Sequence, residues 1–178
     1  VVDTDHFAPG AARAAGEPVV IGWSGSPSTI DHLRPLLPVL ERVMARVGAR
    51  AVIRVMGDPA FAHAPLGLRG EAWTPDAELA LLRRMDSGRM PVADDARAGG
   101  ECGRQGLVSM GMGGPTVMSP VGVNTTIVRD GVNGFLPGSD DSWVDVLCRL
   151  VGDAGLRAGI GAAGRQTVVD EYSVTRWA

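Results

Sequence analysis

The turn from Gly22 to Thr29 combines residue types that can hold a phosphate group. It follows a short apolar run and precedes a segment with helical spacing, so it is predicted to join a buried strand to a helix. Gly25 would let the backbone approach a ligand closely. Hydroxyls and amides at the positive helix end would come from Ser26, Ser28 and Thr29. An ordinary helix N-cap uses the same residue types without a ligand, so both interpretations stay open.

The chain contains no lysine, because all 17 of its basic residues are arginine. A lysine Schiff base and a P-loop with its phosphate-binding lysine are therefore excluded. The formal charge of −3 gives no broad basic surface, so no nucleic-acid partner is expected. His6, His32 and His63 show no metal-ligand spacing, and we expect neither a metal nor a cofactor.

Several other residues have both a chemical and a structural interpretation. Cys102 could be a nucleophile, but no histidine is near it in sequence, which favours a small buried thiol. Asp94 and Asp95 could be catalytic carboxylates, although neighbours in a polar loop point in different directions and favour a solvated turn. Trp73, at the end of a predicted strand, could stack on a base or pack at the rim of the core. The glycines from Gly111 to Gly114 precede a strand and lack the third glycine of a dinucleotide fingerprint.

Apolar runs and helical spacings alternate along the chain. Strands are predicted at Val19–Trp23, Ala51–Met56, Leu68–Trp73, Ser87–Val92, Pro115–Ser119 and Gly134–Leu136. Helices are predicted over Ile30–Val47 (delayed by Pro35 and Pro38), Pro75–Arg84, a segment capped by Asp140–Ser142 and Leu156–Tyr172, with a weak helix at best over Cys102–Gly111. This order predicts an α/β fold with a mostly parallel sheet and helices on both faces. Ligands bind such sheets at the carboxyl ends of the strands.

The chain is predicted to be one domain preceded by a linker. Residues 1–18 have the small, proline-flanked composition of a linker, and residues 19–178 carry the alternating elements. The uncharged stretch from Gln105 to Val128 is interrupted by Pro115 and Pro120, so we expect it to be buried and not to span a membrane. Two cysteines without disulfide or metal spacing, and the lack of a signal-peptide pattern, favour the cytoplasm.

Several segments resemble, in order, the motifs of one enzyme family. They read V-D-T-D-H-F-A-P at 2–9, W-S-G-S-P-S-T at 23–29, M-P-V-A-D-D at 90–95, S-P-V-G-V-N at 119–124, G-V-N-G-F-L at 131–136, A-G-R at 163–165 and E-Y-S at 171–173. This ordered set is similar to the nucleotide-sugar-binding domain of GT-B glycosyltransferases of the large "group 1" family.

The resemblance implies a Rossmann-like three-layer domain, one half of a GT-B fold, with a nucleotide diphosphate sugar as its donor substrate. It implies transfer of the sugar to an acceptor, with retention at the anomeric carbon, in a cleft against an N-terminal acceptor domain that is missing here. The chain alone is then expected to bind the donor without transferring sugar, and no catalytic residue is assigned. The implied donor-binding residues are Gly25, Ser26, Ser28, Thr29, Trp73, Glu101, Cys102, Gly103 and Gln105.

The chain departs from the family pattern in the segment implied to face the donor phosphates. Glu101 and Gln105 replace two family lysines, and Val108 replaces the acid or amide that commonly meets the ribose. Arg104 carries a charge one position away, where a helical neighbour is expected to point about 100° elsewhere. Gly106 and another glycine at 111 lower the helical propensity. The alternative is therefore a degenerate, non-catalytic relative or truncated remnant with a structural or interaction role.

Overall fold

The computed structural model describes residues 1–10, 14, 16–85 and 99–176, and it describes only the backbone of residues 99–102. The predicted strand Ser87–Val92, with Arg89 inside it, lies outside the described residues. The carboxylates of Asp94 and Asp95 and the segment at 90–95 lie outside them as well.

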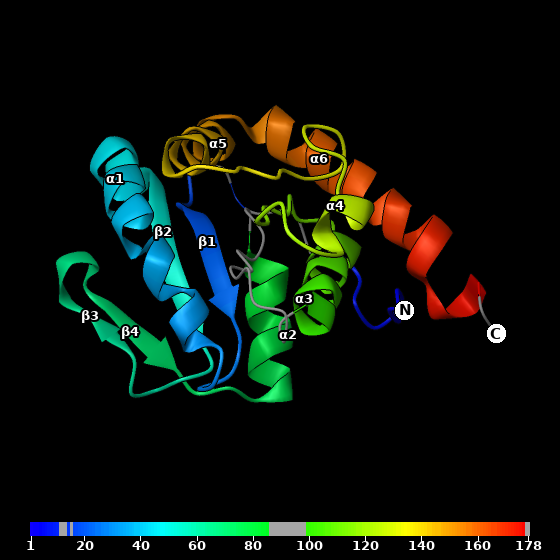
Figure 1. Cartoon of the computed structure of the whole chain (residues 1–178), viewed down its shortest axis with the longest axis horizontal. Coiled ribbons are helices and arrows are strands. Elements are labelled where there is room, and N and C mark those ends of the chain that lie inside the picture. The colour runs from blue at the N-terminus through cyan, green and yellow to red at the C-terminus, as the bar shows by residue number, and fades with distance from the viewer. Residues whose placement is uncertain (11–13, 15, 86–98, 177–178) are drawn as a thin grey trace.

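Four strands form a sheet in the order β1-β2-β4-β3 within the described ranges (Figure 1). The strands are β1 (Val19–Ser24), β2 (Ala51–Met56), β3 (Ala62–His63) and β4 (Leu68–Glu71). β2 pairs in parallel with β1 and β4, and β3 pairs antiparallel with β4. The two predicted strands β1 and β2 are confirmed; the third ends at Glu71, so Trp73 lies beyond it.

One face of the sheet packs on α1 (Leu37–Val47) and α5 (Asp140–Gly152). The delay predicted from Pro35 and Pro38 is confirmed, since two short 3-10 turns, η1 (Ile30–His32) and η2 (Arg34–Leu36), precede α1. The predicted cap of α5 was one residue too late. Ser139 is the N-cap and forms a capping box with Ser142, because its hydroxyl accepts from the Ser142 amide at 3.3 Å.

The other face packs on α2 (Pro75–Arg84) and α3 (Gly99–Gly111), whose buried residues share one apolar cluster with Val20 of β1 and Met56 of β2. α3 is a continuous helix of 13 residues, so the prediction of a weak helix at best was wrong. Tertiary packing outweighs the low propensity of its glycines. A Cβ at Gly106 would lie 2.6 Å from the Met118 side chain, which shows how closely the helix approaches the segment beside it. Helices on both faces confirm the three-layer Rossmann-like class.

The remaining part of the chain covers one end of these layers. It contains α4 (Asn124–Ile127), α6 (Ala154–Thr167), the π-helical turn η5 (Val168–Tyr172) and η6 (Val174–Arg176), while η3 (Gly48–Arg50) and η4 (Ala64–Leu66) are short turns elsewhere. The strands predicted at Pro115–Ser119 and Gly134–Leu136 are reduced to isolated bridges, of Val117 with Phe135 and of Gly134 with Asp130. Proline at 115 and 120 limits that pairing because it has no N–H to donate.

The uncharged stretch from Gln105 to Val128 is divided between α3, a turn and α4. Among the described residues, no helix is both long and apolar enough to cross a membrane.

Arg165 fastens the N-terminal segment to the rest of the fold. Val2 pairs with Ser173, and the Val2 amide donates to the Tyr172 carbonyl at 2.8 Å. The Arg165 guanidinium donates to the carbonyls of Phe7 (3.3 Å), Thr4 (3.4 Å) and Gly111. Residues 2–7 are therefore packed against α3 and α6.

Arg165→Ala is expected to lower the free energy of unfolding by about 2–3 kcal/mol, because three carbonyls lose a charged donor. Urea denaturation measures this loss. Arg69→Ala is the matched control, since Arg69 is exposed on β4 and is expected to change stability by less than about 0.5 kcal/mol. Equal effects of the two substitutions would show that the guanidinium bonds contribute nothing net.

An ion pair on the sheet face predicts a small pH dependence. Arg54 donates to both carboxylate oxygens of Glu71, at 2.5 and 2.8 Å, and this hydrogen bonding lowers the pKa of Glu71 from its ordinary value of 4.5. The stabilisation is present above that ordinary value and is lost as the pH falls through the lowered pKa. Both side chains are more than a third exposed, so we expect only about 0.2–1 kcal/mol. The stability difference between the wild type and Glu71→Gln should therefore be present at neutral pH and vanish in acid.

Candidate functional site

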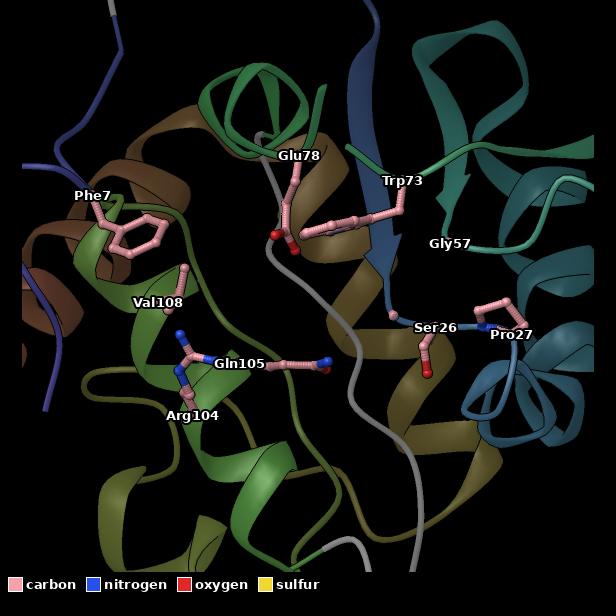
Figure 2. A pocket seen from close by; sticks show the side chains of 10 residues that line it. Phe7, Ser26, Pro27, Gly57, Trp73, Glu78, Arg104, Gln105 and Val108 are labelled. Atoms are coloured by element: carbon pink, nitrogen blue, oxygen red, sulfur yellow. The ribbon is translucent and has the colours of Figure 1, made fainter. Parts of the chain in front are cut away.

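A pocket of about 350 Å³ lies where the carboxyl ends of the parallel strands meet α2 and α3 (Figure 2). Five segments form its walls: the N-terminal segment at Phe7, the turn after β1, the end of β2, the corner between β4 and α2, and one side of α3. Its lining residues are Phe7, Gly25, Ser26, Pro27, Gly57, Trp73, Glu78, Arg104, Gln105 and Val108. A pocket therefore lies at the edge of the sheet where ligands were predicted to bind.

Neighbouring strand ends are tied together at the floor of the pocket. The Gly25 amide donates to the Met56 carbonyl at 3.0 Å, and the Gly57 amide donates to the Glu71 carbonyl at 2.8 Å. Gly57 has a φ of 132°, and a Cβ there would lie 2.3 Å from the Gly25 carbonyl oxygen. Glycine is therefore required at 57, both by its backbone conformation and by this close approach.

The polar groups of the turn after β1 mainly form hydrogen bonds with one another. The Ser26 amide donates to the Thr29 hydroxyl at 2.8 Å, and the Thr29 amide donates to the Ser26 carbonyl at 3.0 Å. The hydroxyls of Ser26 and Ser28 lie 2.8 Å apart. The short 3-10 turns η1 and η2 follow, and the α-helix begins at Leu37. The expected α-helix N-terminus with free amides at this turn was wrong, because Pro35 and Pro38 postpone the helix.

The candidate residues of this turn separate into two groups. Gly25 and Ser26 line the pocket, whereas Ser28 and Thr29 are not among its lining residues. Thr29 makes no side-chain cap bond, so the ordinary N-cap interpretation does not describe it either. Its hydroxyl closes the turn that presents Ser26 to the pocket.

Trp73 and Glu78 form the corner between β4 and α2. Trp73 follows the strand and is 48% exposed, in agreement with a ligand-facing or rim position. Thr74 caps α2 by accepting from the Ala77 amide at 3.1 Å, which places Glu78 in the first turn of the helix. The buried Ser24 hydroxyl, at the end of β1, donates to a Glu78 carboxylate oxygen at 2.8 Å. This bond fixes the carboxylate at the wall of the pocket.

The wall formed by α3 presents Arg104, Gln105 and Val108. Arg104 and Gln105 both line the pocket, although they are successive residues of the helix (Figure 2). Val108, one helical turn further on, lines the same pocket. Gly103 is buried, and a Cβ there would lie 2.6 Å from the Val123 side chain.

Two predicted donor-binding residues, Glu101 and Cys102, have side chains outside the described part of the structure. Sequence reasoning missed Glu78, Gly57 and Phe7 as pocket residues. Glu78 looks like an ordinary acidic residue in a first helical turn, where it complements the helix dipole. Phe7 belongs to the recognised segment at 2–9, which was assigned to a linker. No group of three or more potential metal ligands occurs in the ranges that the structure describes.

Several known structures with the same fold are glycosyltransferases. The C-terminal domain of the group 1 family protein LpcC from Francisella tularensis aligns over 98% of this chain and 100% of that domain, with 17% identity and a TM-score of 0.67. HepE from Anabaena, in complex with UDP and glucose, aligns over 98% of this chain and 52% of its own, with 17% identity and a TM-score of 0.73. TarM from S. aureus aligns over 93% of this chain with 14% identity and a TM-score of 0.70.

The chain has the fold of the C-terminal domain of a GT-B glycosyltransferase. It spans 35% of the length of TarM and 52% of the length of HepE, so the match to those enzymes is to one of their parts. No protein-family model matches the sequence. A search of curated proteins finds no match either. Among these comparisons, the GT-B likeness therefore rests on the arrangement of the backbone.

Proposed function

We propose that this chain is the donor-binding domain of a glycosyltransferase and that its pocket holds a nucleotide diphosphate sugar. One observation carries the proposal: on a GT-B fold, a pocket at the carboxyl ends of parallel strands presents an indole and a guanidinium on different walls. Dinucleotides and nucleotides bind α/β sheets at this position. The structures of HepE and TarM with UDP support the same class of ligand.

The lining residues suggest which wall of the pocket contacts the base and which contacts the diphosphate. Trp73 offers an aromatic face on which a nucleobase can stack. Arg104 supplies positive charge for the diphosphate, and the Gly25–Ser26 backbone allows close approach on the opposite wall. We propose that transfer to the acceptor, with retention at the anomeric carbon, takes place against an N-terminal acceptor domain. The residues of this chain would then bind and orient the donor.

Calorimetric titration of the chain with UDP, GDP and ADP tests the proposal. We expect saturable binding of at least one nucleotide with a Kd between about 1 µM and 1 mM, or about −8 to −4 kcal/mol. Binding of none of them at millimolar concentration would contradict the donor-binding function. That result would favour the degenerate relative with a structural role, for which the replacement of two family lysines at Glu101 and Gln105 is the motivating observation.

Two substitutions should separate the base and phosphate parts of the pocket. Arg104→Gln is expected to weaken the binding of a nucleoside diphosphate by about 10-fold or more and to leave that of the nucleoside unchanged, because a charged hydrogen bond is lost. Trp73→Ala is expected to weaken both by about 10-fold, since stacking on an aromatic ring contributes about 1–3 kcal/mol per base. Arg46→Gln, an exposed site on α1, is the control. If Arg104→Gln weakened nucleoside binding equally, the assignment of the diphosphate to α3 would be wrong.

A further inference from the structure

Phe7 is the residue that the N-terminal segment contributes to the wall of the pocket. Its side chain is half-buried and packs against the apolar cluster that contains Val108. Figure 2 shows the Phe7 ring beside Val108 and across the pocket from the Trp73 indole. An aromatic ring therefore borders the pocket on each of two opposite sides, and one of the rings comes from a segment that precedes the first strand.

A compact turn fixes the direction of the Phe7 side chain. The Asp3 carboxylate accepts hydrogen bonds from the amides of Asp5 and His6, both at 3.0 Å. The Phe7 amide donates to the Asp3 carbonyl at 2.9 Å. Aspartate commonly closes turns in this way, because its side chain bonds to the backbone two residues on. The His6 ring packs edge-on against the Phe7 ring, with the ring centroids 4.8 Å apart. The direction of the ring is therefore determined within residues 3–7.

Arg165 joins this turn to the helix on the same side of the pocket. Its guanidinium donates to the carbonyls of Phe7 (3.3 Å) and Thr4 (3.4 Å), and also to that of Gly111 at the end of α3. α3 is the helix that forms the adjoining wall of the pocket. Arg165 itself is not among the lining residues. Any effect of these bonds on a ligand is therefore indirect, through the placement of Phe7 against α3.

We propose that Phe7 binds the nucleoside part of the donor and that Arg165 is the positioning residue for Phe7. This inference rests on the proposed donor-binding function and adds a binding residue from the N-terminal segment. The Phe7 ring and the Val108 methyls carry no charge and no hydrogen-bonding group that could hold a diphosphate. They offer a large apolar contact area to a base and a ribose that Trp73 contacts from the other side.

The spacing along α3 agrees with this division of the ligand. Arg104, which is assigned to the diphosphate, precedes Val108 by four residues, or about 6 Å along the helix axis. Residues four apart lie on the same face of a helix, so both meet the pocket. A nucleoside beside Val108 and a diphosphate beside Arg104 thus follow one another along the same wall.

The contact with Phe7 couples ligand binding to the order of the N-terminal segment. A ligand that binds more tightly when this segment is in place also stabilises the segment, by the same factor. Hydrogen exchange of the Phe7 amide, with and without saturating nucleotide, measures this coupling. We expect the exchange to be slower in the complex. An unchanged rate would contradict the inference, and this comparison needs no variant.

Titrations with the tightest-binding of UDP, GDP and ADP, and with its nucleoside, test both residues. Phe7→Ala is expected to weaken both ligands by about 10-fold, because an aromatic contact is lost. Arg165→Ala should weaken both by about 3–10-fold, and Arg165→Lys by less, since it retains a charged donor. When it is combined with Phe7→Ala, Arg165→Ala should have no further effect, because residues that act through one contact are not additive.

Arg157→Ala is the matched control. Arg157 lies on the same helix as Arg165, and its guanidinium donates to the carbonyls of Leu150 (2.6 Å) and Val151 (3.2 Å), which belong to α5. Its replacement is expected to lower the stability of the fold without changing either affinity. A loss of affinity equal to that of Arg165→Ala would show that general destabilisation, and not the placement of Phe7, is responsible.

Each other outcome of the titrations has a definite meaning. Unchanged affinities in Phe7→Ala would overturn the inference. A loss for the diphosphate but not for the nucleoside would place the ring at the phosphates and would also overturn it. An undiminished effect of Arg165→Ala in the double variant would exclude the positioning role. In these cases nucleotide binding by the wild type, and with it the proposed function, would stand. Failure of the wild type to bind any nucleotide would contradict the proposed function and the inference together.

Discussion

Gly161→Ala is expected to lower the free energy of unfolding by about 3–5 kcal/mol, which exceeds the effect of most single substitutions. Gly161 lies in α6 at the point where this helix crosses the turn after α3. A Cβ at 161 would lie 2.0 Å from the Gly113 carbonyl oxygen and 3.0 Å from its carbon. Both are backbone atoms, so no side chain can rotate away to make room. The two segments would have to move apart and open the contact between α3 and α6.

Gly159→Ala is the matched control, because Gly159 is in the same helix with nothing within 4 Å of the Cβ position. Alanine favours a helix over glycine by about 1 kcal/mol, so this variant should be more stable than the wild type by about 0.5–1 kcal/mol. Chemical denaturation of both variants measures the two effects. If the same substitution were stabilising at both positions, α6 would not lie against the turn at 113 as described.

The sequence predicted those helices and strands whose bounds are determined by nearby residues. β1, β2 and α2 begin and end within about one residue of the predicted bounds, because apolar runs, proline and a threonine cap determine them. α3 could not be predicted in the same way. Its glycines lower the intrinsic propensity, and only the contacts of Leu107 and Met110 with the rest of the core make up for it.

The location of the candidate site could be predicted from the sequence. Which residues line it could be predicted only in part. The turn at Gly25–Ser26 and the half-exposed Trp73 both follow strands, so their positions follow from the order of elements. The role of Thr29 depends on whether an α-helix begins beside it, which proline prevents. Arg104 lines the pocket together with its neighbour Gln105, and no property of the sequence gives the width of a cavity.

Asn133 is the site of the second large expected effect. Its side chain is 1% exposed and completes three hydrogen bonds: the amide nitrogen donates to the Ile127 carbonyl (3.2 Å) and the Thr167 hydroxyl (3.1 Å), and the amide oxygen accepts from the Arg129 amide (2.7 Å). Asn133→Leu keeps a side chain branched at the same carbon but leaves the Ile127 carbonyl and the Arg129 amide without this partner. We expect a loss of about 3–4 kcal/mol, measured by urea denaturation, since each orphaned group costs about 1–3 kcal/mol.

Asn133→Asp should distinguish hydrogen bonding from packing, because it changes the shape of the side chain very little. The new carboxylate can still accept from the Arg129 amide, but its other oxygen would face the Ile127 carbonyl, to which it cannot donate. Burial and this repulsion should raise the pKa of the new carboxyl above its unfolded value. A raised pKa means stability that is present in acid and lost as the pH rises through it. The variant should therefore lose more stability relative to the wild type at about pH 8 than at about pH 4. Little loss of stability at either pH would show that the volume of the side chain, and not its donor group, holds the turn at 127–136 against α6.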